Sequence, residues 1–147
     1  MDEDTLTIEI SVVDLAGLTV SGLGNIEMDA LATSGLDLVI SGGGNVSLDA
    51  LQAESLDILV SGLGNLDVAG KVNGCKIEIS GGGSVEAGDL ECQVVDANIS
   101  GLGNITVWAT EQLTGSITGG GSVSYYGNPQ TDTESTGLGK FKALGEK

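Results

Sequence analysis

A glycine-rich motif of five residues recurs along the chain and constrains the fold more than any other feature. It reads SGLGN or SGGGN in most copies and varies to SGGGS, TGGGS and TGLGK, and the copies open at Ser21, Ser41, Ser61, Ser80, Ser100, Thr118 and Thr136. Successive copies begin 20, 20, 19, 20, 18 and 18 residues apart. A nearly fixed period of this length is typical of solenoids, in which each unit supplies one coil. We therefore expect residues 1–147 to form a single domain.

Hydrophobic residues alternate with polar residues on both sides of each motif. A period of two predicts strands with one buried face, and the glycine pairs interrupt every candidate helix. The hydrophobic positions lie five, three and one residues before the opening Ser or Thr, and five and seven residues after it. In the unit of Ser61 these positions are Leu56, Ile58, Val60, Leu66 and Val68.

The strands are near copies of one another, which favours parallel coils over antiparallel hairpins. Coils stacked about 4.8 Å apart place each hydrophobic side chain on its equivalent in the next coil. The sequence therefore predicts an all-β fold, a single-stranded parallel β-helix of about seven coils with about 20 residues per coil. We expect right-handed winding, because parallel crossovers generally have that hand.

The motifs are predicted to form the corners of the coils. Glycine reaches positive φ at little cost, as a sharp corner requires. Stacked asparagine side chains can hydrogen-bond to the backbone or to each other. The expected corner residues are Gly22, Gly24, Asn25, Gly42, Gly44, Asn45, Gly62, Gly64, Asn65, Gly81, Gly83, Gly101, Gly103, Asn104, Gly119 and Gly121.

The central residue of the motif alternates between leucine and glycine, as Leu23, Gly43, Leu63, Gly82, Leu102, Gly120 and Leu138. In one arrangement each unit is one coil, and each leucine fills space over the next glycine. In the other, two units make one coil of about 39 residues, with leucine and glycine corners on opposite edges. We prefer the first, because about 20 residues is an adequate perimeter for a packed interior, but the sequence leaves both open.

Charge and composition exclude several classes of function. The chain has 21 acidic residues and five basic residues, all of them lysines, so the net charge is −16. Histidine is absent. Nucleic-acid binding needs clustered cations, and imidazole-dependent hydrolases and histidine zinc sites need histidine, so these classes are excluded. No hydrophobic run approaches the roughly 18 residues of a membrane span.

Three features of residues 5–144 resemble the head GIN domain family, described as heads of auto-transporter adhesins of unknown molecular function. They are the repeated SGxGN followed by a hydrophobic residue, the L-D-L type of strand before it, and the closing segment from Tyr125 to Pro129 before the last TGLG. The resemblance implies a right-handed β-helix in a bacterial protein that is exported to the periplasm, outer surface or medium. No catalytic residues can be carried over from the family, and we expect no enzymatic activity. Because the acidic start of this chain differs from a leader, we expect the leader to have been removed.

Two functions remain in view. The first is a non-enzymatic cell-envelope or secreted module for adhesion or protein interaction, and the second is a carbohydrate-binding or carbohydrate-active β-helix. A smooth acidic surface would favour the first, and a groove of converging aspartates and aromatic residues the second. We expect a protein or glycan partner on the cell surface, no nucleic acid, and a monomer or weak end-to-end homo-oligomer.

Outward-facing acids form short ladders that suggest a calcium site. Asp37 and Asp57 lie four residues before a motif, and Asp29 and Asp49 lie eight residues after the start of one. Carboxylates stacked one coil apart repel by roughly 1 kcal/mol even in water. A divalent cation would relieve this repulsion, as Lys76 does within one ladder. The competing interpretation is a solvated acidic face, and no other cofactor is expected.

The aromatic residues and cysteines have structural interpretations. Trp108, Tyr125, Tyr126 and Phe141 gather near the C-terminus, where they would plug the open end of the solenoid or form a sugar-binding patch. Cys75 and Cys92 fall on neighbouring coils about three positions apart, which makes a disulfide difficult. We expect both to be small buried hydrophobic residues. The turn-like composition of residues 128–135 predicts a mobile loop.

Overall fold

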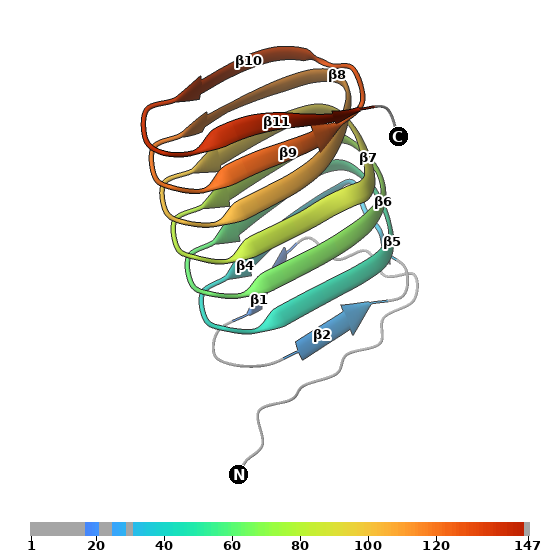
Figure 1. The fold of residues 1–147 in the computed structure, drawn as a ribbon. Coiled ribbons are helices and arrows are strands. Elements are labelled where there is room, and N and C mark those ends of the chain that lie inside the picture. The colour runs from blue at the N-terminus through green and yellow to red at the C-terminus, as the bar shows by residue number, and fades with distance from the viewer. Residues whose placement is uncertain (1–16, 21–24, 29–30, 146–147) are drawn as a thin grey trace.

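The computed structural model describes residues 17–20, 25–28 and 31–145, and every regular element in this part of the chain is a β-strand. The strands pair only in parallel. They form a solenoid of about six turns with about 19 residues per turn (Figure 1). In chain order they are β1 (Gly17–Val20), β2 (Asn25–Met28), β3 (Leu31–Ala32), β4 (Gly35–Ile40), β5 (Asn45–Val60), β6 (Asn65–Ile79), β7 (Ser84–Ile99), β8 (Asn104–Ile117), β9 (Ser122–Tyr126), β10 (Gln130–Ser135) and β11 (Lys140–Gly145).

The winding is right-handed. In Figure 1 the chain crosses the near side from left to right and returns on the far side from right to left, while it climbs from the N-terminal to the C-terminal end. The parallel β-helix predicted from the sequence is confirmed, with about six turns in the described residues where about seven were expected.

The predicted hydrophobic columns form the core. Leu38 pairs with Ile58, Ile58 with Ile77, and Ile77 with Ala97, and these four side chains are at most 2% exposed. From residue 36 onward, the predicted column positions are buried except Gly115 and Tyr125, which are half-buried. Each fully buried aliphatic side chain contributes about 1.5–3 kcal/mol relative to exposure, so the repeated columns are the main source of stability.

The corners need glycine for a different reason from the one predicted. Among the described glycines, positive φ occurs at Gly70, Gly127 and Gly145, none of which belongs to a corner motif. A Cβ on Gly62 would lie only 2.4 Å from the carbonyl oxygen of Gly42 in the preceding coil. The expected positive φ is therefore wrong for the described corners, because glycine is needed there for the close approach of stacked backbones. Gly22 and Gly24 lie outside the described residues.

Each repeat unit forms one coil, as preferred from the sequence. The Leu63 amide donates to the Gly42 carbonyl at 3.0 Å, and the Gly82 amide donates to the Gly62 carbonyl at 3.1 Å. Leu63 Cδ2 lies 2.9 Å from the position that a Cβ on Gly82 would occupy. Each leucine thus leans over the glycine of the next coil, which explains the alternation.

The predicted asparagine ladder is present at the start of the strands. Asn65 Nδ2 donates to Asn45 Oδ1 at 3.2 Å, and Ser122 Oγ donates to Asn104 Oδ1 at 2.9 Å. These bonds join side chains one coil apart. Serine therefore substitutes for asparagine in the ladder, as the motif variants indicate.

The C-terminal coil covers the end of the core. Tyr125 and Phe141 pack against the buried cluster, and Phe141 Cε1 lies 3.4 Å from the position of a Cβ on Gly115. Tyr125 and Phe141 therefore cover the end of the core, as predicted for the aromatic residues near the C-terminus.

The loop predicted for residues 128–135 is wrong over β10, which pairs with β8 along its whole length. Its threonines at 131 and 133 take positions opposite Leu113 and Gly115, in line with the core columns. Threonine favours strands and tolerates exposure, and the β10 side chains are all exposed. The charged residues Asp132 and Glu134 on this strand disfavour the addition of a further strand at the end of the stack.

Candidate functional site

A groove opens on the outside of the solenoid beside a corner where the strand register shifts. The shifts occur between residues 48 and 51, 67 and 69, and 87 and 91, and we call this corner the bulged corner. The groove has a volume of about 450 Å³, within the range of about 300–1,000 Å³ typical of ligand sites. Its lining residues are Leu48, Asp49, Asp67, Val68, Ala69, Glu86, Gly88, Asp89, Thr106 and Tyr126.

One row of groove residues comes from the outward positions of the first straight segment of each coil. Asp67 pairs with Glu86, and Glu86 pairs with Thr106, so the three side chains lie on consecutive coils. The two carboxylates are exposed and one coil apart. Unit charges about 4 Å apart repel by about 1 kcal/mol in water. A cation placed between them would remove this repulsion.

The bulged corner supplies two more carboxylates. Leu48 pairs with Val68 and Leu51 with Gly70, so β5 has one residue more than β6 here, and Asp49 lies in the extra segment. On the other side, Ala69 pairs with Asp89. Bulges redirect side chains and recur next to binding and active sites. Asp49 and Asp89 therefore flank the small Ala69 side chain, which leaves the groove open between them.

Tyr126 forms the aromatic wall of the groove. It ends β9 and pairs with Trp108 of β8. Its Cε2 atom lies 3.2 Å from the position that a Cβ on Gly88 would occupy, and Gly88 is buried. The tyrosine ring thus lies over a glycine two coils away. The aromatic residues expected to act together are divided, because Tyr125 and Phe141 cover the core while Tyr126 lines the groove.

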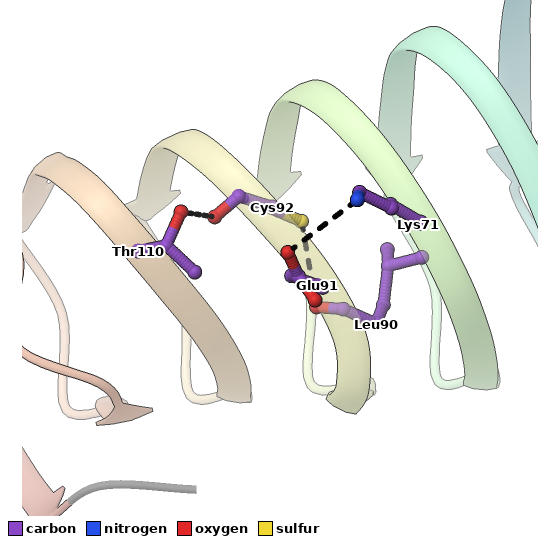
Figure 2. Close-up of polar contacts among 5 residues, drawn as sticks. All are labelled: Lys71, Leu90, Glu91, Cys92 and Thr110. Atoms are coloured by element: carbon purple, nitrogen blue, oxygen red, sulfur yellow. Dashed lines mark hydrogen bonds and ion pairs between the residues drawn. The ribbon is translucent and has the colours of Figure 1, made fainter.

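Two residues beyond the groove-lining Ala69 and Asp89, an ion pair joins β6 and β7 (Figure 2). Lys71 Nζ is 3.9 Å from Glu91 Oε2, and the two residues pair in register. On the neighbouring coil, Thr110 Oγ1 donates to the carbonyl oxygen of Cys92 at 3.3 Å. The Lys71 side chain is 66% exposed, and ion pairs of this kind contribute at most about 1 kcal/mol. No lysine is among the groove-lining residues.

A second, smaller depression of about 240 Å³ lies on another face, over Asp37, Asp57, Lys76 and Glu78. Asp37 pairs with Asp57, and Asp57 pairs with Lys76. Burial raises the pKa of Asp57 above its ordinary value, and the hydrogen bond and charge of Asp37 raise this pKa further, while the charge of Lys76 opposes them. The predicted ladder is therefore present, with Lys76 partly neutralising it.

The raised pKa of Asp57 gives a pH-dependent stability. The folded state binds this proton more tightly than the unfolded state, so the stabilisation is full below the unfolded pKa of about 3.9 and is lost as pH rises through the folded value. We expect Asp57→Asn to equal the wild type at pH 3 and to be more stable at pH 7 by no more than about 0.5 kcal/mol, because the site is exposed. Urea unfolding at both pH values measures this, with Asp132→Asn as control. A less stable Asp57→Asn at pH 7 would contradict it.

The four predicted calcium ligands do not form one group. Asp37 and Asp57 are neighbours in the second depression. Asp49 lies in the groove, and Asp29 lies outside the described residues. Within residues 17–20, 25–28 and 31–145, no three carboxylate or thiol groups gather closely enough to hold a metal ion. Calcium binding stays a prediction.

Sequence reasoning missed most of the groove. Asp67 and Glu86 stand two residues after the motif's last Asn or Ser, an outward position that the alternation could have identified. Asp89 gives no such signal, because the bulged corner changes the offset from the motif between coils. The same irregularity hid an additional buried set, Leu51, Val72, Leu90 and Ala109.

Comparison with known proteins identifies the family. The family described as "Putative auto-transporter adhesin, head GIN domain" matches residues 1–129. The chain belongs to the head GIN domain family. The resemblance inferred from the repeated motif is therefore confirmed. Comparison with curated proteins gives no match.

Solved structures of similar shape are known for proteins described as adhesins. A "putative adhesin" from Bacteroides fragilis is 31% identical, with a TM-score of 0.83 over 88% of this chain and 60% of that chain. Two others, from Parabacteroides distasonis and Parabacteroides merdae, have TM-scores of 0.89 and 0.78 at 19% and 20% identity, covering 95% and 96% of this chain and 60% and 63% of theirs. The latter two show a shared fold alone. This head GIN chain thus spans about three-fifths of the length of these structures.

Within the residues that the structure describes, no helix is long and hydrophobic enough to cross a membrane.

Proposed function

We propose that this head GIN domain is a non-enzymatic, exported module for adhesion or protein interaction, and that its groove binds a cationic segment of a partner protein. Membership of a family described as adhesins supports the general role. One observation carries the specific proposal, namely a groove of about 450 Å³ lined by Asp49, Asp67, Glu86 and Asp89 and by no lysine.

The chemistry of the groove suits a lysine or arginine side chain. Its carboxylates accept charge-assisted hydrogen bonds, and the face of a tyrosine ring, here that of the half-buried Tyr126, attracts cations. The net charge of −16 steers cationic partners toward the chain from a distance. The in-register coils hold the carboxylates on neighbouring strands, so little ordering is required when the partner binds.

A binding role agrees better with the groove than catalysis. Its polar side chains are carboxylates, the Thr106 hydroxyl and the Tyr126 phenol. No imidazole can activate the hydroxyl as a nucleophile, because the chain contains no histidine.

Glycan binding or cleavage is the second candidate. The expected mark of this class, a groove of acidic and aromatic side chains, is present in Asp67, Glu86 and the Tyr126 ring. Sugar sites combine carboxylates with aromatic surfaces, so this observation favours the second candidate. A glycan array tests for glycan binding, and a panel of chromogenic glycosides tests for glycan cleavage. Retention of a neutral glycan that is lost in Asp67→Asn would favour it over the cationic protein segment.

The test of the main proposal is calorimetric titration with an oligolysine peptide and an oligoarginine peptide at about 0.15 M salt, where long-range attraction is screened. We expect the double variant Asp67→Asn/Glu86→Gln to bind at least about tenfold more weakly, which corresponds to about 1.4 kcal/mol. Tyr126→Ala should also weaken binding if the ring contacts the cation.

The matched control is Glu78→Gln/Asp132→Asn, which removes the same charge from exposed positions outside the groove. We expect it to change affinity less than about threefold, because only long-range attraction is lost. Equal losses in the two double variants would show attraction by net charge alone. That result, or no binding by the wild type, contradicts the proposed groove.

A further inference from the structure

The last coil of the solenoid contains β10 and β11, which lie on opposite sides of the stack and run in opposite directions (Figure 1). Within the residues that the structure describes, β10 pairs only with β8, and β11 pairs only with β9. Each of the two strands therefore has one edge with no strand beside it in this part of the chain. The backbone groups along such an edge are a template for pairing with another strand.

The core columns change from hydrophobic to polar on one side of this coil. Thr131 stands opposite the fully buried Leu113 of the preceding coil, and Thr133 occupies the next column position. On β11, Phe141 continues the column of Val123. A further coil with aliphatic columns would bury the threonine hydroxyls, which is unfavourable without hydrogen-bond partners. The surface that fits this coil therefore has the same mixture of hydroxyl and hydrophobic groups, as a second copy of the coil has.

The charges on the two strands are opposite and have the same spacing. On β10, Asp132 and Glu134 alternate with the column positions, and on β11 Lys140 and Lys142 do so. All four side chains are exposed, and their charges cancel, although the whole chain has a net charge of −16. The two carboxylates disfavour a further strand unless cations lie opposite them. The β11 strand of a second copy carries such cations at the required spacing.

We propose that two copies of this chain associate through their C-terminal ends, with β11 of each copy added to β10 of the other. A two-fold axis across the end, parallel to the strands, places the β11 strand of one copy over the β10 strand of the other. Because β10 and β11 run in opposite directions (Figure 1), the added strand is antiparallel. The interface is isologous, so both strand pairs are the same and assembly closes at two copies. This dimer is one form of the end-to-end homo-oligomer expected from the sequence.

One register of this pairing satisfies both the charges and the alternation of faces. In this register Lys140 lies opposite Glu134 of the second copy. Two residues further along β11, Lys142 lies opposite Asp132. Opposite charges on directly facing strand positions stabilise antiparallel pairing. The two-fold axis repeats the arrangement on the other side of the coil, so the dimer contains four such charge pairs.

Hydrophobic contacts add to the charge pairs. In the same register Phe141, which is half-buried in the single chain, lies opposite Thr133 of the second copy. The two-fold axis passes the corner that carries Leu138, so the Leu138 side chains of the two copies lie near each other. Leu138 is 90% exposed, whereas Leu63 and Leu102, at the same position of the motif, are 73% exposed. Those two leucines lean over the glycine of the next coil, and the second copy takes this place for Leu138.

The first test is the oligomeric state of the full chain in solution. Two pairs of short strands make a small interface, and small interfaces are typical of weak association. Sedimentation velocity is therefore measured at protein concentrations up to about 1 mM, which detects dissociation constants in the millimolar range. We expect an equilibrium of monomer and dimer with no larger species. A monomer at every concentration overturns the proposal, and so does growth into larger species, which would indicate head-to-tail stacking.

Charge reversal then tests the strand pairing. The variant Lys140→Glu/Lys142→Glu and the variant Asp132→Lys/Glu134→Lys each place like charges opposite each other in both strand pairs. We expect each variant alone to associate at least about tenfold more weakly than the wild type, because like charges directly opposite are destabilising. An equimolar mixture of the two variants restores opposite charges in both strand pairs, so a dimer should form again. A mixture that stays monomeric would overturn the proposed pairing.

The matched control is Lys71→Glu/Lys76→Glu, which makes the same change of net charge at exposed positions of β6. We expect it to change the dissociation constant less than about threefold, because only long-range repulsion increases. Leu138→Ala should weaken the dimer, and Leu102→Ala should leave it unchanged. Equal effects of the two lysine variants would assign association to net charge alone and contradict the proposed end contact. No residue of β10 or β11 lines the groove, so these results are independent of the proposed function.

Discussion

Replacing Gly101 by alanine is expected to lower the free energy of unfolding by about 3 kcal/mol or more, at the upper end of the cost of overpacking. The new Cβ would lie 2.2 Å from the Gly81 carbonyl oxygen of the preceding coil. This oxygen accepts the hydrogen bond from the Leu102 amide at 3.0 Å. Because the clash is with backbone, no side chain can rotate away, and the two coils must separate locally.

Gly74→Ala is the matched control, since it adds the same methyl group elsewhere on the solenoid. No atom outside the neighbouring residues lies within 4 Å of the position of its Cβ, and its φ is not positive. Alanine there should be neutral or stabilising by up to about 1 kcal/mol, because it restricts the unfolded chain. Urea unfolding of both variants measures the difference. Similar midpoints would contradict the close approach of the corners.

The second large effect is expected for Ile77→Ala in the middle of a core column. Ile77 is fully buried between Ile58 and Ala97. Removing a buried isoleucine side chain to the β-carbon costs about 2–5 kcal/mol, and the upper part of this range applies where the surroundings cannot collapse. The coils are fixed by hydrogen bonds at the corners, so we expect about 3–4 kcal/mol.

Leu102→Ala is the control for the column. It removes an aliphatic side chain of the same size, but Leu102 is 73% exposed at a corner. We expect a loss below about 0.5 kcal/mol, as for other surface substitutions. Chemical unfolding with a common slope for all variants is the measurement. Equal losses from Ile77→Ala and Leu102→Ala would mean that the columns are not the core.

The fold was predictable because each unit repeats the same physical pattern. The alternation around the motif of Ser61 identifies Leu56, Ile58 and Val60 as buried, and the register then stacks them on Cys75, Ile77 and Ile79. The parallel stack follows from the repetition, which no hairpin arrangement explains.

The conformation of the corners was not predictable in the same way. Glycine was correctly placed at the turns, but it is selected by contact between coils, as at Gly62 and Gly42. Such a contact exists only after the coils are stacked, so it cannot be deduced from the conformational preference of a single glycine. The strand at Gln130–Ser135 was missed for a related reason, because its polar composition reflects its place at the end of the stack.

The groove depends on the departures from repetition. Tyr126 reaches over Gly88 because β8 has no residues paired with residues 88–90. Asp89 stands opposite Ala69 only after the register shift between β6 and β7. Insertions of one to three residues carry no periodic signal, so the sequence indicated an acidic surface and left the position of the groove undefined.

The in-register parallel stacking of the coils is tested most directly by nuclear Overhauser contacts between methyl groups in protein with labelled Ile, Leu and Val side chains. The structure predicts contacts between Ile58 and Ile77 and between Val60 and Ile79, which pair on neighbouring coils. Antiparallel pairing of the same segments would instead bring Leu56 close to Ile79. Contacts of the first kind support the account, and contacts between Leu56 and Ile79 in their place would contradict it.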